Sequence, residues 1–208
     1  MEIMKYVNMV GDYIQYNAPV TLSMFFISFL VWMLGALTKG KSTNKLFSTT
    51  RGSLLNPLTY IRLFTHVLGH SDWNHFASNY MKILILGPLI EEKYGSINLL
   101  VMIAVTAFIT GVVNFLKDGG SLRGASGIAF MFIVLSAFVN VTENKVPLTL
   151  ILVILFYIVD EIRDLGKKDN VAHYGHIIGA ICGVVFGFAY LYGDIFSVIS
   201  SWIAKLYS

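Results

Sequence analysis

Long apolar runs separated by shorter polar connections dominate the sequence. Six of the runs are long enough to cross about 30 Å of hydrocarbon, either upright or tilted. They cover residues 20–37, 75–90, 97–116, 126–141, 146–162 and 172–192. The pattern predicts an all-α membrane protein whose six transmembrane helices pack into one bundle. We therefore treat residues 1–208 as a single membrane domain with a six-span core over 20–192.

The connections between the runs are short, with one exception. Residues 38–74 are too many for a simple turn in a compact bundle, so we expect a long first loop with a function of its own. Residues 1–18 have apolar positions at roughly helical spacing, which predicts a segment lying at the membrane surface. Residues 193–208 are expected to form a short tail. The runs that open at residues 75 and 126 are too short or too polar to face lipid alone, so neighbouring helices should cover them.

The amino-acid composition indicates which medium surrounds the protein and which classes of partner it can bind. Of the 208 residues, 56% are hydrophobic and only 13% are charged, whereas a soluble domain carries about 25% charged residues. This balance excludes an ordinary soluble domain and leaves lipid as the medium. The net charge is only +3 and the positive residues are scattered, so the sequence lacks the clustered basic pattern that binds nucleic acid. The single cysteine, Cys182, permits no intramolecular disulfide and is interpreted as a small buried apolar residue.

The last run carries the first candidate for chemistry. Glycines recur there at every fourth position, at Gly175, Gly179, Gly183 and Gly187, so they line one side of a helix and let another helix approach its backbone. His176 stands beside the first of them. An ionisable side chain within a span is costly unless it faces a partner or water. His176 is therefore a candidate site residue, and a structural hydrogen bond is the equally weighted alternative.

A second candidate lies where a polar, glycine-rich connection turns into the fourth run. The segment reads Gly124-Ala125-Ser126-Gly127, which places Ser126 at a helix N-terminus. Small neighbours leave room for a carbonyl group to approach the Ser126 hydroxyl, and nearby backbone N–H groups point toward the charge that would develop. A glycine–serine cluster that merely starts a helix is the plain alternative.

His75 and Asn79 form the third candidate. Their spacing of four puts both side chains on one face of the second span, one turn apart. A neutral histidine and an amide can both donate hydrogen bonds to an oxyanion without burying a charge. A helix cap combined with polar contacts between helices is the alternative interpretation.

Together these motifs resemble those of intramembrane serine proteases of the rhomboid family. The resemblance extends from about residue 60 to residue 192 and, by position, includes the first span. The family pattern has an arginine in the first loop, a histidine and an asparagine in the second span, Glu-x-x-x-Gly after it, Gly-x-Ser-Gly at the start of the fourth span and His-x-x-Gly in the sixth. The matching positions are Arg62, His75, Asn79, Glu91, Gly95, Gly124, Ser126, Gly127, His176 and Gly179.

The resemblance implies a protease that cuts transmembrane segments of other proteins. Ser126 would be the nucleophile and His176 the general base, in a dyad without a third carboxylate. No Asp or Glu lies in the sixth span, so a carboxylate could come only from elsewhere in the chain. His75, Asn79 and backbone N–H groups would bind the oxyanion.

The same resemblance bears on other positions. The glycine face would seat the sixth span against the fourth, so a bulky residue in place of Gly179 should lower both activity and stability. Ile61 precedes Arg62 where the family usually has tryptophan, and Phe130 follows the serine by one turn where the family often has tyrosine. Neither change removes a group that makes or breaks bonds, so we expect an active enzyme. The fifth span and residues 160–170 are expected to form a mobile gate and lid, and the residue before the cut should be small.

Other functions are left open. A catalytically inactive rhomboid-like binder would keep the fold without turnover, and a transporter would explain the glycine face but not the placement of the serine and histidine. The protease hypothesis needs no metal or cofactor; its partners are transmembrane substrates and lipid, with no nucleic acid and no stable partner evident. A metal- or haem-binding membrane protein would use the five histidines as ligands, although no His-Glu-x-x-His motif is present. These histidines are His66, His70, His75, His173 and His176.

The family orientation puts the N-terminus in the cytoplasm and opens the active site toward the outside of the cell membrane. The positive residues oppose this orientation, because ten of them would lie outside and only four inside. We keep the family orientation because the match of motifs to span order is the more specific observation. The outside set is Lys39, Lys41, Lys45, Arg51, Arg62, Lys117, Arg123, Arg163, Lys167 and Lys168, and the inside set is Lys5, Lys93, Lys145 and Lys205.

Overall fold

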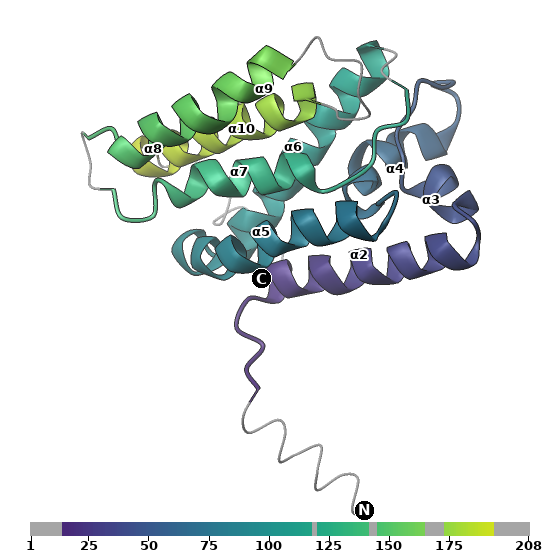
Figure 1. Ribbon diagram of the computed structural model, residues 1–208, viewed down its shortest axis with the longest axis horizontal. Coiled ribbons are helices and arrows are strands. Elements are labelled where there is room, and N and C mark those ends of the chain that lie inside the picture. The colour runs from purple at the N-terminus through teal and green to yellow at the C-terminus, as the bar shows by residue number, and fades with distance from the viewer. Residues whose placement is uncertain (1–13, 118–119, 142–144, 165–172, 194–208) are drawn as a thin grey trace, which may run out of the picture.

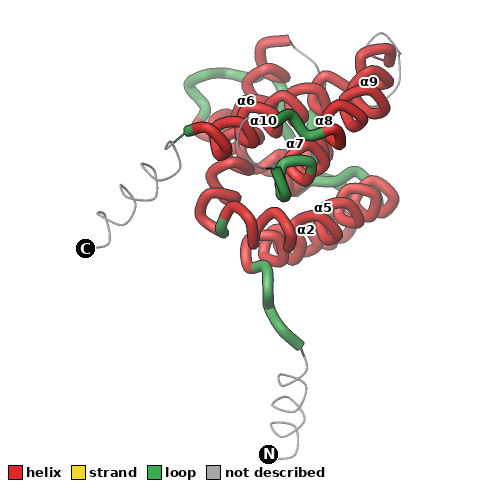
Figure 2. The backbone as a smooth tube through the Cα atoms, turned by 90° about the vertical axis from the view of Figure 1, so that its left-hand side faces the viewer, coloured by secondary structure: helices red, strands yellow, loops and turns green. Residues whose placement is uncertain are grey.

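The computed structural model describes residues 14–117, 120–141, 145–164 and 173–193. Within these ranges the chain is helical apart from its connections and one isolated bridge between Thr49 and Leu122 (Figures 1 and 2). The all-α prediction is confirmed for this part of the chain. The elements are α2 (Pro19–Leu37), α3 (Lys41–Leu46), α4 (Pro57–Thr65), the 3-10 turn η1 (His66–Leu68), α5 (Trp73–Tyr94), α6 (Ser96–Lys117), α7 (Ser126–Ser136), α8 (Leu148–Val153), the π-helical segment η2 (Ile154–Ile158), α9 (Val159–Asp164) and α10 (His173–Tyr192).

Helices lie at each of the predicted runs, with two differences. The fourth run ends early as a helix, at Ser136 instead of residue 141, because Ala137 and Phe138 donate to carbonyls three residues back and so close a tighter turn. The fifth run is divided by η2 into α8 and α9. Residues 1–13 of the predicted surface segment, most of the predicted lid and all but the first residue of the predicted tail lie outside the described residues. Residues 14–18 are described and are not helical.

Three helices have the length and apolar composition needed to cross a membrane, namely α2, α6 and α10. α7 is apolar but only 11 residues long. α5 has 22 residues, but its polar side chains lower its hydropathy. The membrane character of the chain therefore rests on three helices, and the count of six spans stays a prediction.

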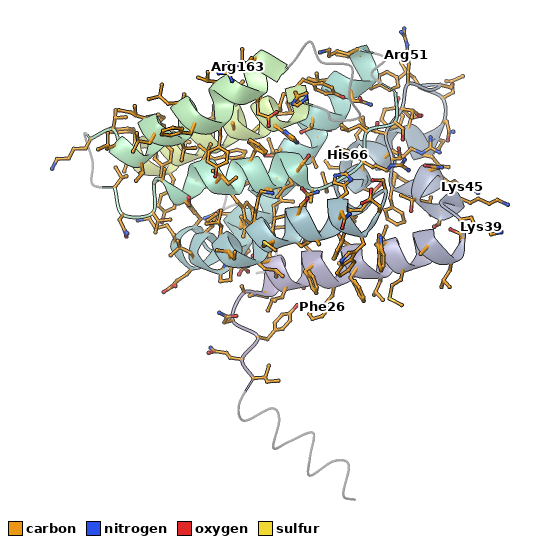
Figure 3. All side chains as sticks on the ribbon, viewed as in Figure 1. Phe26, Lys39, Lys45, Arg51, His66 and Arg163 are labelled. Atoms are coloured by element: carbon orange, nitrogen blue, oxygen red, sulfur yellow. The ribbon has the colours of Figure 1, made fainter. Side chains whose placement is uncertain are left out.

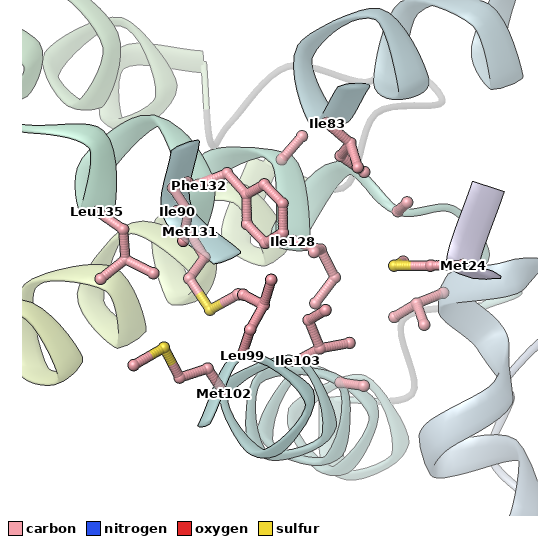
Figure 4. Packing of buried hydrophobic residues seen from close by; sticks show 14 of the residues in the cluster. Met24, Ile83, Ile90, Leu99, Met102, Ile103, Ile128, Met131, Phe132 and Leu135 are labelled. Atoms are coloured by element: carbon pink, nitrogen blue, oxygen red, sulfur yellow. The ribbon is translucent and has the colours of Figure 1, made fainter. Parts of the chain in front are cut away.

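α7 lies at the centre of the fold. It packs against α10 on one side and α5 on the other, α2 covers the far side of α5, and α9 lies beside α10 (Figure 1). The apolar side chains of α7 meet those of α5 and α6 in one buried cluster (Figure 4). Neighbouring helices thus cover α7, as its short length and polar start predicted. The labelled members are Met24, Ile83, Ile90, Leu99, Met102, Ile103, Ile128, Met131, Phe132 and Leu135.

Residues 38–72, which connect α2 and α5, fold into a unit that rests on α6. It contains α3, α4 and η1, and the backbone of Leu63 in α4 lies against Gly111 of α6, where a Cβ atom would overlap it. Thr49 exchanges two backbone hydrogen bonds of 2.9 Å with Leu122, which ties the loop to the segment before α7. Arg62 donates from Nε to the carbonyl of Lys45 at 2.8 Å. His66 and Lys45, from opposite ends of this unit, are labelled in Figure 3.

The glycines of α10 face α7 along the whole contact. A Cβ atom added to Gly179 would overlap the carbonyl oxygen of Gly127, and one added to Gly127 would lie 3.1 Å from the carbonyl oxygen of Gly175. Further along, Gly183 and Gly187 meet residues of α7 and the turn that follows it. Because the order of contacts rises along both helices, α7 and α10 run parallel and their N-termini meet.

Glu91 near the end of α5 joins the start of α2. Its carboxylate accepts hydrogen bonds from the backbone N–H groups of Val20 (2.8 Å) and Thr21 (3.0 Å), from the Thr21 hydroxyl (2.9 Å) and from the Ser96 hydroxyl (2.7 Å). The first N–H groups of a helix have no acceptor within the helix, so this carboxylate caps α2 from another helix. Gly95, four residues on, has a φ of +82° and ends α5.

We expect Gly179→Ala to destabilise the protein by about 1–3 kcal/mol or more, because the added methyl group meets backbone and the two helices must separate. Thermal unfolding in detergent measures the effect. Gly52→Ala is the matched control, since the nearest atom to a Cβ there is 3.6 Å away. A Gly179→Ala protein as stable as the control would contradict the close contact.

We expect Glu91→Ala to lower the free energy of unfolding by about 2–4 kcal/mol, because four donors lose a charged acceptor and two of them are the orphan N–H groups of α2. Glu92→Ala, at an exposed neighbouring position, should have little effect. The rate at which a protease cuts α2 reports its unfolding and would compare the Glu91→Ala and Glu92→Ala variants. Equal stabilities of the two variants would argue against the cap.

Candidate active site

Ser126 is the first residue of α7. The preceding glycine, Gly124, has a φ of +123°, a conformation that side-chain-bearing residues rarely adopt, and its N–H donates to the carbonyl of His66 at 2.9 Å. The bend at Gly124 leads directly into α7. The N–H groups of Ser126 and Gly127 lie in the first turn of α7, where they have no acceptor within the helix.

His176 lies in the first turn of α10, at the end where α10 meets α7. Its ring stacks on Phe130 with centroids 4.4 Å apart and planes within 6° of parallel. Phe130 stands four residues after Ser126 on α7, so the stack brings His176 to the same end of α7 as the serine. The predicted Ser126–His176 pair is therefore gathered at the joint N-termini of two parallel helices.

His75 and Asn79 of α5 flank the turn before Ser126. A Cβ atom on Gly124 would lie 2.6 Å from Nε2 of His75 and 3.6 Å from Nδ2 of Asn79. Both side chains thus reach the bend of the Gly-x-Ser segment, and only a glycine leaves room for the histidine ring there. The structure brings together Ser126, His176, His75, Asn79, Gly124, Gly127 and Phe130, the residues singled out from the sequence.

His70 also belongs to this group, although the sequence indicated it only as one of the histidines of a possible metal or haem site. Its Nε2 accepts from Nδ2 of Asn79 at 3.2 Å and from the backbone N–H of Ala125 at 3.4 Å. Burial, with a smaller contribution from the nearby charge of His75, lowers the pKa of His70 to about 3, so Nε2 keeps its lone pair and remains an acceptor. His70 precedes His75 by five residues in the sequence. This spacing alone did not indicate that His70 accepts a hydrogen bond from Asn79.

A short polar chain orients His75. The Ser71 hydroxyl donates to the Asp72 carboxylate at 2.7 Å and lies 3.1 Å from Nδ1 of His75. A hydroxyl has one proton, so Nδ1 of His75 is the donor in the second contact. Hydrogen bonds from Ser71 and from the backbone N–H of His75 lower the pKa of Asp72. Nε2 of His75 can then donate only when both ring nitrogens carry protons.

His66 anchors the first loop to α6. Its Nε2 donates to the carbonyl of Ala107 at 3.0 Å, and its own carbonyl accepts from Gly124. Burial lowers the pKa of His66 to about 4. The ring is therefore neutral at ordinary pH and acts as a structural link.

The histidines do not gather at one point, as a site built from all of them would need. Glu161 of α9 joins His173 and His176 in a group whose ligand atoms lie within 4.8 Å of one another, which would suit a metal ion. Glu161 is also the carboxylate that the sixth span itself does not supply. Its Oε2 lies 2.7 Å from Nδ1 of His173 and 3.0 Å from Nδ1 of His176.

The two departures from the expected pattern have visible consequences. Ile61 is exposed, and the adjacent Tyr60 donates from its hydroxyl to the carbonyl of Leu54 at 2.9 Å, within the loop. Phe130 presents its ring face to His176, so the missing hydroxyl does not prevent the stack.

Three helices are long and apolar enough to cross a membrane. Ser126 and His176 lie near the N-termini of two parallel helices, α7 and α10. The family model described as the rhomboid domain matches residues 57–193. This chain belongs to the rhomboid family.

Curated relatives agree with this assignment at modest identity. The chain is 24% identical over 143 residues to rhomboid-like protein 11, chloroplastic, of Arabidopsis thaliana, covering 61% of this chain and 51% of the relative. It is 29% identical over 173 residues to rhomboid protease GluP of Bacillus subtilis, covering 78% and 34%. It is 28% identical over 134 residues to rhomboid protease GlpG of Salmonella paratyphi A, covering 61% and 47%. The chain spans about half or less of the length of these relatives.

We expect the free energy of unfolding to fall as the pH is lowered from about 6.5 toward 4. His66 and His70 have folded pKa values of about 4 and about 3, whereas an unfolded histidine titrates near about 6.5. The unfolded chain therefore takes up protons first, and each histidine contributes at most about 1.4 kcal/mol per pH unit to the loss. Denaturant unfolding at several pH values measures the slope. His70→Gln should have a shallower slope than the unchanged protein, and identical slopes would rule out His70 as a source.

Proposed function

We propose that this chain is an intramembrane serine endopeptidase that hydrolyses peptide bonds in or near transmembrane segments of other membrane proteins. The observation that carries the proposal is the parallel packing of α7 and α10, which brings Ser126 and His176 to one end of a helix pair and stacks the histidine on Phe130. Membership of the rhomboid family and relatives named as proteases support the same reading.

In the proposed reaction, Ser126 Oγ attacks the scissile carbonyl carbon. His176 Nε2 accepts the hydroxyl proton as the new C–O bond forms, and it returns that proton to the leaving amine when the C–N bond breaks. Water then attacks the acyl-enzyme, again with His176 as base, and regenerates the serine. No metal or cofactor takes part in these steps.

The oxyanion would lie at the start of α7. The first-turn N–H groups of α7 and the second N–H of Asn79 Nδ2, whose other proton faces His70, are neutral donors for it. His75 would add a donor in its charged form, because its Nδ1 proton already faces Ser71. Asn79 is thus proposed as the main side-chain donor at neutral pH.

Substrate entry is proposed to pass the fifth helical segment. The side chains of α8, η2 and α9 are mostly exposed, and Phe130 of α7 meets Tyr157 of η2 edge to face with centroids 6.4 Å apart. A helix that buries little apolar surface in the protein can separate from it at low cost. A substrate strand would then reach the glycine-lined turn at Gly124, where a small residue before the cut fits best.

The chain is proposed to span the cell membrane several times with its N-terminus in the cytoplasm and the site opening outward. Its partners are transmembrane substrates and lipid. The positive residues of the first loop, among them Lys39, Lys45 and Arg51 (Figure 3), would then lie outside, against the usual charge rule. A reporter fused after Ser208 that reads as exported would reject this orientation.

Two other functions have specific support. A catalytically inactive rhomboid-like binder would share the fold, and one relative is named rhomboid-like without the word protease. A metal-binding protein would use Glu161, His173 and His176, which are close enough to share an ion. Both alternatives leave Ser126 without an activated hydroxyl.

We expect a fluorophosphonate probe to label Ser126 of the purified protein in detergent, because a serine activated by a neighbouring base attacks such phosphorus centres. Ser126→Ala should abolish labelling, His176→Ala should lower it to background, and Asn79→Ala should lower its rate by about 10- to 1000-fold. Mass spectrometry of the labelled peptide identifies the residue.

Ser136→Ala is the matched control, since this serine lies at the other end of α7 and donates to the carbonyl of Ile133. A folded protein whose Ser126 stays unlabelled would favour the inactive binder. An unlabelled Ser126 in a folded protein that binds a divalent cation, with binding lost in His173→Ala, would favour the metal-binding alternative instead.

A further inference from the structure

The carboxylate of Glu161 approaches the candidate base from a third helix. One oxygen, Oε2, lies 2.7 Å from Nδ1 of His173 and 3.0 Å from Nδ1 of His176. The side chain of Glu161 is 16% exposed, that of His173 is 10% exposed and that of His176 is 12% exposed. Water screens such a group of charges weakly, so the carboxylate acts strongly on both rings.

Two contacts bear on the orientation of the His176 ring. Phe130 sets the plane of the ring by stacking, and Glu161 faces its Nδ1 edge. Nδ1 of His176 has no hydrogen bond of good geometry to any described residue, and the Glu161 oxygen that His173 shares lies 3.0 Å from it, within ion-pair distance. A proton held on Nδ1 leaves Nε2 of the neutral ring with a lone pair, which is the state that a general base needs.

We propose that Glu161 is a positioning residue for His176, which keeps the histidine proton on Nδ1 and offsets the positive charge that the ring gains when it accepts the Ser126 proton. The inference rests on the proposed function. The serine proton moves to Nε2 of His176 and no further, and it leaves with the amine, so no proton passes to Glu161. His173 holds the same carboxylate oxygen and restrains its direction.

Glu161 stands on α9, directly after the π-helical segment η2. Insertion of a π turn rotates the residues that follow it, so η2 sets which side of α9 faces α10. The carboxylate meets His176 only while α9 lies against α10. The position of the fifth helical segment would therefore control the orientation of the base as well as substrate entry.

The other ionisable groups that act on His176 are His173 on α10 itself and Lys82 and His75 on α5, whereas α7 presents the apolar ring of Phe130. Glu161 is the only acid in this set of described residues. Without its charge, the ring has neutral or positive neighbours and protonation becomes harder. The acid limb of a pH–rate profile should then move to lower pH while the maximum rate falls.

The test measures the rate constant for fluorophosphonate labelling of Ser126 between about pH 5 and 9. Glu161→Gln should label about 10- to 100-fold more slowly at the optimum and show the shifted acid limb. Glu161→Asp keeps the charge and should regain part of the rate, which a protein that had merely lost its fold would not do. Glu92→Gln, the same change at an exposed glutamate of α5, should match the unchanged protein. Rates and profiles of Glu161→Gln equal to this control would overturn the proposal.

A second readout does not depend on turnover. Nitrogen NMR of the histidine-labelled protein reports which ring nitrogen of His176 carries the proton. We expect Nδ1–H in the unchanged protein and a mixture of tautomers in Glu161→Gln. A ring already protonated on Nε2 in the unchanged protein would overturn the role of Glu161 even if Ser126 is labelled, whereas an unlabelled Ser126 with an Nδ1–H ring would count against the proposed function alone.

Discussion

The close backbone contact between α7 and α10 is the constraint on which the candidate site depends. A Cβ atom on Gly179 would overlap the backbone of Gly127, and one on Gly127 would lie 3.1 Å from the carbonyl oxygen of Gly175. The two helices lie parallel with their N-termini together. Ser126 begins one of these helices and His176 lies in the first turn of the other. The site therefore follows from helix packing, while the loops around it refine the positions of single groups.

Much of this arrangement could be predicted from the sequence because its signals are local. The fourfold spacing of the glycines, the Gly-x-Ser-Gly segment and the pair His75 and Asn79 each occupy a few turns of one helix. Helical periodicity places such residues on a common face without knowledge of the fold. The order of these motifs then indicated the family that the domain match established.

What could not be predicted joins residues far apart in the chain. Three such contacts depend on which helices are neighbours. Glu91 caps the start of α2, His70 accepts a hydrogen bond from Asn79, and Glu161 lies beside His176. The early end of α7 and the helices within the first loop were missed for a related reason. Apolar composition marks where a chain can be buried, but tertiary contacts decide where its helices stop.

The parallel course of α7 and α10 also has an electrostatic consequence. Each helix carries a partial positive charge at its N-terminus from its aligned peptide dipoles, and here two such ends meet. Their combined field favours negative charge on an oxygen near Ser126 and opposes positive charge on His176. Two helix ends that favour an anion thus make a cationic base more costly, and a carboxylate brought in from α9 counters that field from the far side of the ring.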